Sequence, residues 1–120
     1  MIQFTIPVAP VTKKNHQQIV KANGRLLVVP SKQYRQYEAD CGMFLKALGI
    51  NGRVNIKALY YMPTRRRVDL CNLHEALCDV LVKHGVIADD NSNIVAGMDG
   101  SRVLYDKNNP RTEIIIEEIG

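Results

Sequence analysis

The sequence predicts a single α+β domain in which a mixed, mostly antiparallel sheet carries two main helices. Several segments alternate apolar and polar residues with the period of two that half-buried strands show, and two others repeat apolar residues at helical spacing. The chain has 120 residues, of which 46% are hydrophobic, so it is long enough for one hydrophobic core and short for two. No internal repeat, low-complexity tract or linker divides it, and we therefore expect residues 1–120 to form one domain.

The N-terminal part predicts a strand, a basic loop and a hairpin arm. Apolar residues alternate with polar ones over residues 1–8, which predicts the first strand. Residues 13–16 follow two prolines and collect positive charge in a loop that could touch a phosphate backbone or could simply be solvated. Turn residues at 21–24 precede a short apolar run over 25–29 that ends at Pro30, which predicts an edge strand or one arm of a hairpin.

A first helix is predicted to begin after Ser31 and to stop at Gly49. Serine is a favoured N-cap residue, and glycine commonly follows the last turn of a helix. Cys41 lies in the apolar stripe of this helix, so we expect it to be a small core residue, and the two tyrosines could stack on bases or cap the core. The stripe that should face the core consists of Tyr34, Tyr37, Cys41, Phe44, Leu45 and Leu48.

A central strand over residues 53–62 is predicted to lead directly into a second helix. Alternate residues of this strand are apolar, and its other face also becomes apolar towards the end. A basic loop over 64–67 then carries the chain to a helix over 70–84, with Asp69 at the N-cap position and Gly85 as the stop. The buried stripe of this helix should consist of Leu70, Leu73, Leu77, Val80, Leu81 and His84.

The C-terminal part predicts two further strands. Residues 93–105 are rich in Val, Ile, Met and Gly, which predicts a strand with an irregularity at Gly97 and a bend at Asp99 and Gly100. A last strand over 111–119 has apolar residues on both faces, so residues 114–116 should be well buried.

Composition restricts the environment and the partners of the chain. The formal net charge of +4 suits a polyanionic partner, although the same balance also serves solubility. The three cysteines are odd in number, lack the spacing of a disulfide scaffold and accompany no segment that resembles a signal peptide, so we expect a reducing cytoplasm. No apolar run approaches the roughly 20 residues that a membrane-spanning helix needs, and we expect no membrane partner.

Three aspartates suggest a magnesium site. Asp69 stands at the start of the second helix, and Asp89 and Asp90 lie in an acidic turn. Carboxylates that lie close together repel one another unless a cation sits between them, and Mg²⁺ prefers oxygen ligands. Such an ion would bind phosphate oxygens, help to generate hydroxide from water and offset charge on a leaving oxygen. The alternative is that Asp69 only caps the helix and that residues 89–91 only form a polar turn.

Arg65, Arg66 and Arg67 immediately precede this acidic helix start. Their fork-shaped donors suit the clamping of phosphates, and the backbone amides at the start of the helix add positive potential nearby. A run of charges is more often only a solvated surface, but the position next to the aspartate favours phosphate binding.

A zinc site on the second helix is a further hypothesis, because Cys71, His74 and Cys78 follow one another at spacings of three and four. Three ligands on one helix have no Cys-x-x-Cys partner, and thiolates would be unsuited to a magnesium site. Packing at the edge of the core is therefore the favoured role of His74 and Cys78.

Several motifs occur together in the centre of the chain. They are a basic run, an Asp-x-x-Asn pair, an aspartate seven residues after the asparagine and an Asp-Asp pair, here Arg65 to Arg67, Asp69 with Asn72, Asp79, and Asp89 with Asp90. This combination resembles the RusA-type Holliday junction resolvases of phages and prophages. The chain length, the N-terminal strand with its proline-rich continuation and the closing strands also fit, so the resemblance covers essentially the whole chain.

The resemblance implies a homodimeric, Mg²⁺-dependent endonuclease of the bacterial or phage-infected cytoplasm that acts in DNA recombination and repair. Such an enzyme binds four-way DNA junctions through a basic face and nicks two opposed strands symmetrically, and paired nicks require two active sites related by a two-fold axis. By position, Asp69 and Asp90 match the metal-binding catalytic aspartates and Asp89 their less critical neighbour. Asn72 and Asp79 match helix positions that support the site.

Two positions depart from the family pattern. Cys71 stands where the family usually has a second aspartate, and Glu75 stands where it often has a lysine. A thiol is a poor ligand for a hard cation, so Cys71 could weaken Mg²⁺ binding, and Glu75, one turn further along, could restore the negative charge. Positive charge near the scissile phosphate would then come from the three arginines or from Lys83, with Lys13 and Lys14 as further DNA contacts.

The sequence thus leaves three functional hypotheses. The chain is an active junction resolvase, or a junction-binding module whose cleavage is weakened by the altered acidic set, or a small zinc- or thiol-dependent protein that uses Cys71, His74 and Cys78. Phosphate contacts would make DNA affinity fall steeply with salt, which the third hypothesis does not predict.

Overall fold

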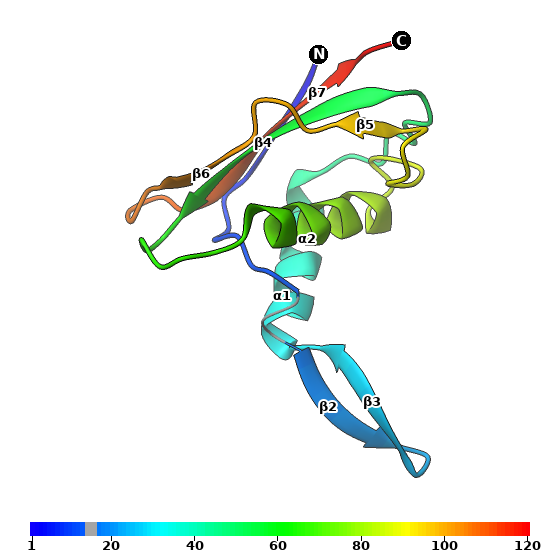
Figure 1. The fold of residues 1–120 in the computed structure, drawn as a ribbon, viewed down its shortest axis with the longest axis vertical. Coiled ribbons are helices and arrows are strands. Elements are labelled where there is room, and N and C mark those ends of the chain that lie inside the picture. The colour runs from blue at the N-terminus through cyan, green and yellow to red at the C-terminus, as the bar shows by residue number, and fades with distance from the viewer. Residues whose placement is uncertain (14–16) are drawn as a thin grey trace.

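The computed structural model describes residues 1–13 and 17–120. A mixed sheet forms the body of the molecule, two helices lie on one side of it, and a separate hairpin projects away (Figure 1). This arrangement confirms the predicted α+β fold. The strands of the sheet are β1 (Ile2–Ile6), β4 (Val54–Met62), β5 (Val95–Gly97), β6 (Arg102–Tyr105) and β7 (Arg111–Glu118). The helices are α1 (Lys32–Cys41), the short 3₁₀ helix η2 (Gly42–Phe44) and α2 (Leu70–Lys83).

Strand β4 is central, as its apolar pattern predicts. It pairs antiparallel with β7, which in turn pairs antiparallel with the edge strand β1. Its other edge pairs in parallel with β5 near the start of the strand and with β6 near its end. The sheet is therefore mixed, and its antiparallel ladders are the longer ones.

The prediction of one strand over residues 93–105 is wrong, because β5 and β6 are separate strands. The chain leaves the sheet between them at the predicted bend, where Gly100 has a φ of +85°. Polar groups of β4 hold the bend in place. The Asn55 side chain bonds both the backbone oxygen (3.2 Å) and the backbone nitrogen (2.8 Å) of Asp99, and the Ser101 hydroxyl accepts from the Ala58 amide at 3.0 Å.

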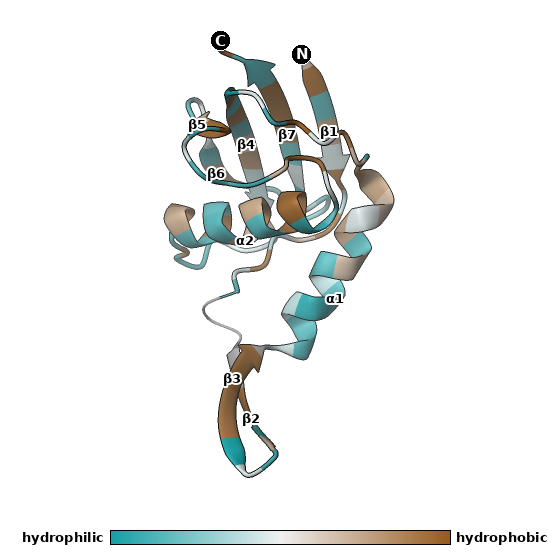
Figure 2. Cartoon of the chain, turned by 90° about the vertical axis from the view of Figure 1, so that its right-hand side faces the viewer, coloured by the Kyte–Doolittle hydropathy of each residue, from teal (hydrophilic) through white to brown (hydrophobic). Residues whose placement is uncertain are grey.

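The hydrophobic core lies between one face of the sheet and the two helices (Figures 1 and 2). Ile114 and Ile116 of β7 point into it and are buried, whereas Ile115 points to the opposite face and is only half-buried. The expectation that residues 114–116 are all well buried is therefore correct for two of the three. The alternating face of β4 contributes Val54, Ile56, Ala58 and Tyr60 to the core.

The first helix begins as predicted but ends early. Ser31 caps it, with its hydroxyl accepting from the Tyr34 amide at 3.1 Å, and the helix continues to Cys41 and then tightens into η2. The prediction that apolar residues up to Leu48 face the core from one helix is wrong. Phe44 and Leu48 are exposed, because the chain becomes extended at Leu45 and its backbone then bonds the segment after α2.

Helix α2 matches its predicted range within one residue. Its buried residues are Leu73, Ala76, Leu77, Cys78, Val80 and Leu81, so Leu70 and His84 of the predicted stripe are only half-buried. No helix among the described residues is both long and apolar enough to cross a membrane.

Strands β2 (Gln17–Ala22) and β3 (Arg25–Pro30) form an antiparallel hairpin of their own. Asn23 and Gly24 join them with φ angles of 51° and 75°, the conformation of a tight type I′ turn. The predicted hairpin arm is thus confirmed for β3, while β2 was not anticipated. Both views show the hairpin standing clear of the body (Figures 1 and 2).

Candidate functional site

The three arginines lie on the loop that joins β4 to α2, and all three are exposed. The Arg65 guanidinium stacks on the Tyr105 ring at 4.2 Å from its centroid, which holds this side chain against the end of β6. Arg66 and Arg67 line a groove of about 450 Å³. Its other walls include Thr12 and Gln33, so the N-terminal loop and the start of α1 meet the arginine loop here.

Asp69 occupies the N-cap position of α2, but its carboxylate does not cap the helix. The backbone oxygen of Asp69 accepts from the Asn72 and Leu73 amides at 3.1 and 3.2 Å. One carboxylate oxygen instead accepts from the Asn72 side-chain amide at 3.3 Å. The capping alternative therefore accounts for the backbone only, and the exposed carboxylate stays available to a ligand while Asn72 orients it.

Residues 89–91 form a polar turn in which Asp89 is the structural member. Its two carboxylate oxygens accept from the Asp90 amide at 2.8 Å and from the Asn91 side-chain amide at 3.1 Å. These hydrogen bonds lower the pKa of Asp89. The Asp90 carboxylate is exposed and lies near Cys78, whose pKa rises to about 11 through burial first and then through the charges of Asp90 and Asp79. Asp90 is thus beside α2 and free to bind a ligand.

Asp79 and Lys13 form an ion pair at 3.1 Å that ties the N-terminal loop to α2. The Lys13 ammonium also lies 5.9 Å from the centroid of the Tyr34 ring. Lys83 similarly pairs with Glu38 of α1 at 2.8 Å while staying largely exposed. Both lysines therefore combine a structural contact with positive charge at the surface, and Lys14 lies outside the described residues.

A complete metal cage is absent from the part of the chain that the structure describes, where no three His, Cys, Asp or Glu side chains gather in a group that could hold an ion. Asp69, Asp89, Asp90 and Glu75 therefore stay a predicted ligand set. Their oxygen donors nonetheless suit Mg²⁺, which proteins usually bind through one or two carboxylates together with waters and substrate phosphates. Cys71 and Glu75 are both exposed on α2.

The cysteines and histidine of α2 do not converge as a zinc site would require. Cys71 is exposed, whereas Cys78 is buried, as its predicted core packing requires. His74 Nδ1 lies 2.7 Å from the hydroxyl of the buried Tyr60, and burial lowers the pKa of the imidazole. His74 thus has a structural partner within the fold.

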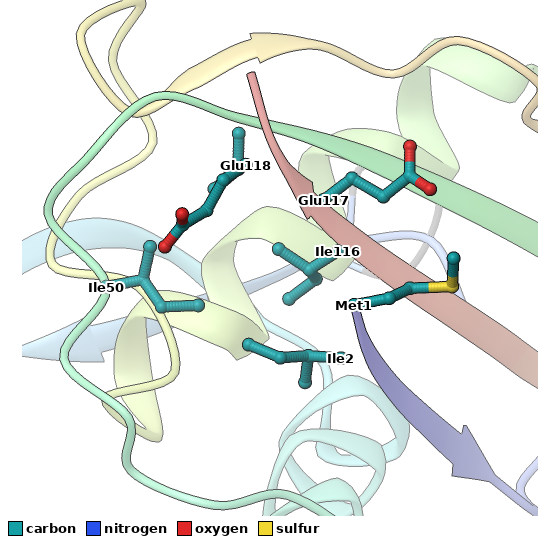
Figure 3. Close-up of a pocket in the computed structure, with 7 residues that line it drawn as sticks. Met1, Ile2, Ile50, Ile116, Glu117 and Glu118 are labelled. Atoms are coloured by element: carbon teal, nitrogen blue, oxygen red, sulfur yellow. The ribbon is translucent and has the colours of Figure 1, made fainter. Parts of the chain in front are cut away.

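Sequence reasoning missed Tyr105, Thr12 and Gln33 as neighbours of the arginine loop. Tyr105 comes forty positions after Arg65, and no local pattern links the two. A further pocket, of about 370 Å³, lies near both chain termini, where Ile2, Ile50 and Ile116 face a hollow with Glu118 at its edge (Figure 3). This pocket near the termini is lined by none of the predicted site residues.

The arginine loop and the Asp69 carboxylate thus lie at the start of α2, and the Asp90 carboxylate lies near Cys78, further along the helix. Residues 7–117 match the family described as Endodeoxyribonuclease RusA. The chain belongs to the RusA family. A search of curated proteins found no match. The family description names an endodeoxyribonuclease, so the predicted resemblance is confirmed and the family match supports assignment of the chain to the nucleases.

Proposed function

We propose that the protein is a Mg²⁺-dependent endodeoxyribonuclease that resolves four-way DNA junctions by paired, symmetric nicks. The observation that carries the proposal is the family match over residues 7–117. The proposal takes Asp69 and Asp90 as the catalytic aspartates, as the sequence resemblance implies. In this proposal the substrate is branched DNA, and a homodimer supplies two active sites for the two nicks.

In this proposal the arginines bind phosphate and Asn72 orients a metal ligand. Arg66 and Arg67, exposed beside Asp69, would bind the phosphates of the cleaved strand through their planar donor sets. Asn72 would hold the Asp69 carboxylate in one orientation. The bound metal would supply Lewis-acid stabilisation of the phosphate and a more acidic water.

Cleavage of a labelled four-way junction tests this function directly. We expect nicks on two opposed strands with Mg²⁺, none with EDTA and none on the matching linear duplex. Asp90→Asn should abolish the nicks. Asp99→Asn is a matched control, because it makes the same change at another exposed aspartate, in the bend before β6. Junction cleavage that survives Asp90→Asn would exclude the assigned role of this carboxylate.

The altered acidic position offers a sharper test. Cys71→Asp restores the carboxylate that the family pattern usually has. Even a residue that only supports a metal ligand is worth about 10- to 100-fold in metal affinity, so we expect at least a roughly ten-fold gain in Mg²⁺ affinity. Cys71→Ser changes the thiol without adding charge and should leave the affinity unchanged. If Glu75 compensates for Cys71, Glu75→Gln should weaken Mg²⁺ binding, and an unchanged affinity would exclude that role.

A second candidate is a junction-binding module with weakened cleavage. It is favoured by the exposed thiol of Cys71 and by the lack of a three-ligand group among the described residues. Both candidates bind DNA through phosphates, so both predict an affinity for the junction that falls steeply with salt. Tight junction binding without Mg²⁺-dependent nicks would favour the module.

A further inference from the structure

The β2–β3 hairpin exposes more apolar side chain than its role within one chain explains. Ile19, Leu26 and Val28 are 71%, 76% and 64% exposed. Ile19 is paired with Val28, and Leu26 with Lys21, so these four side chains lie on one face of the hairpin. Val20 and Leu27, on the other face, are also exposed. Contiguous exposed apolar surface on this scale marks an interaction site.

The backbone of the hairpin points to the same conclusion. Its two strands pair only with each other among the described residues, so each has an open edge. An isolated two-stranded hairpin is marginally stable in water, and open edges are ready to pair or to be covered. A partner that packs on this arm would cover both its exposed apolar side chains and its open strand edges.

The charged residues of the arm lie near its tip. Lys21 and Arg25 flank the Asn23-Gly24 turn, and both are exposed. The remaining described side chains of the strands are aliphatic or small. A matching surface on the partner should therefore be an apolar groove with an acidic group at one end.

The same chain carries such a groove along α1. We call it the α1 groove; it has a volume of about 500 Å³ and mostly apolar walls, and its residues include Val8, Ala9, Val11, Gln36, Tyr37 and Asp40. It begins at Lys32 and Gln33 in the first turn of α1, next to the root of the hairpin, and ends at Asp40. The Asp40 carboxylate accepts from the Gln36 amide at 2.8 Å and has no ion-pair partner within the described part of the chain.

We infer that the β2–β3 hairpin is a dimerisation arm that docks in the α1 groove of a second copy of the chain. The inference rests on the proposed function, since paired nicks require two copies. In a two-fold arrangement each arm runs from the start of the partner's α1 towards the partner's Asp40, where Lys21, on the same face of the hairpin as Leu26, meets the carboxylate. A six-residue strand spans about 20 Å, and nine helical residues span about 13 Å, so the arm is long enough.

DNA fits the arm less well than a second copy does. Nucleic-acid surfaces attract cations and hydrogen-bonding groups along their whole length. Among the described side chains, the face that carries Leu26 offers three aliphatic residues and one lysine, and the lysine lies near the tip.

Sedimentation equilibrium of the full chain tests the inference. We expect a dimer whose dissociation constant rises about ten-fold or more in Leu26→Asp, because a charge at the centre of an apolar interface is strongly unfavourable. Met43→Asp is the matched control, since Met43 is 80% exposed and lies outside the arm and the α1 groove, and its dimer should be unchanged. A monomer at all concentrations, or a dimer unaffected by Leu26→Asp, would overturn the inference.

Cross-linking tests the position of the arm independently. In a chain that also carries Cys71→Ser, the pair Lys21→Cys and Asp40→Cys should form disulfides between two copies under mild oxidation, because Lys21 lies on the docking face. Lys21→Cys with Lys46→Cys, a residue outside the α1 groove, should not. Equal cross-linking of both pairs would contradict the docking geometry.

The outcomes separate this inference from the proposed nuclease function. A dimer lost in Leu26→Asp, from a protein that cuts no junction, supports the arm and rejects the nuclease. Junction cutting by a protein whose dimer ignores Leu26→Asp supports the nuclease and rejects the arm. Loss of junction binding in Leu26→Asp with an unchanged dimer would make the arm a DNA contact and reject dimerisation through it.

Discussion

Helix α2 and the β2–β3 hairpin have similarly apolar sequences, but the apolar side chains of α2 are buried and those of the hairpin are exposed. Leu77, Val80 and Leu81 of α2 are fully buried against the sheet. Ile19 and Leu26 of the hairpin are more than two-thirds exposed. The apolar pattern therefore determines which element forms, but it does not reveal whether the covering surface belongs to the same chain.

The two regions also differ in how their contacts are made. The core around α2 joins strands from both ends of the chain, since β1 pairs with β7 and β7 with β4. The hairpin is local, because its strands are joined by a two-residue turn. We therefore expect substitutions in the body to change the stability of one chain, and substitutions in the hairpin to change association.

The largest difference should come from truncating one leucine in each region. Leu77→Ala removes a fully buried side chain and should lower the free energy of unfolding by about 2–5 kcal/mol. Leu26→Ala removes an exposed side chain and should change it by no more than about 0.5 kcal/mol in the monomer. Urea unfolding at a protein concentration too low for dimers measures both. A large loss in Leu26→Ala under these conditions would mean that the arm packs within its own chain.

Glycines of the body provide a second contrast. A Cβ atom at Gly42 would lie 2.5 Å from the His84 ring, whose Nε2 donates to the Glu38 carbonyl at 2.7 Å. Gly42→Ala should therefore displace the ring and cost about 1–3 kcal/mol of unfolding free energy. Gly52→Ala is the matched control, because nothing lies within 4 Å of its Cβ position, and it should be neutral in the same urea titration. Equal stabilities of the two variants would contradict the close packing of His84 on Gly42.

The sequence predicts those elements whose signals are local. Alternation in β4, the Ser31 cap of α1 and the span of α2 all follow from residues within a few positions of one another. The early end of α1 could not be predicted, because it depends on backbone bonds from Gly49 and Ile50 to the segment after α2. The separation of β5 from β6 likewise depends on polar side chains of β4, far away in the chain.

In the candidate site, too, contacts between near neighbours in the sequence could be predicted, and contacts between distant residues could not. The contact between Asp69 and Asn72 follows from their spacing on one helical turn. The stacking of Arg65 on Tyr105 and the pairing of Lys13 with Asp79 join residues 40 and 66 positions apart, and no local pattern predicts such contacts. The distance of Asp90 from Asp69 depends on the path of the chain around α2, so the composition of the metal site stays a prediction.

A smaller effect is expected at the tip of the hairpin. Gly24 has a φ of +75°, and a side chain there costs about 1–2 kcal/mol. Gly24→Ala should therefore accelerate amide hydrogen exchange in β2 and β3 by roughly 5- to 30-fold and leave α2 unchanged. In Gly42→Ala the pattern should be reversed, with faster exchange in the body. Faster exchange of α2 in Gly24→Ala would show that hairpin and body fold as one cooperative unit.

The smallest effect concerns pH and again distinguishes the two regions. Burial lowers the pKa of His74 in the fold below its unfolded value of 6.5, so the unfolded chain binds more protons as pH falls through that value. This contribution to stability is complete above the unfolded pKa and is lost as pH falls towards the folded one. Urea unfolding of the monomer between pH 7.5 and 5.5 should therefore show a decline that His74→Gln flattens. Leu26→Ala should retain the full decline, because the exposed arm contains no part of the Tyr60 and His74 contact. A decline that persists in His74→Gln would assign the proton to another group.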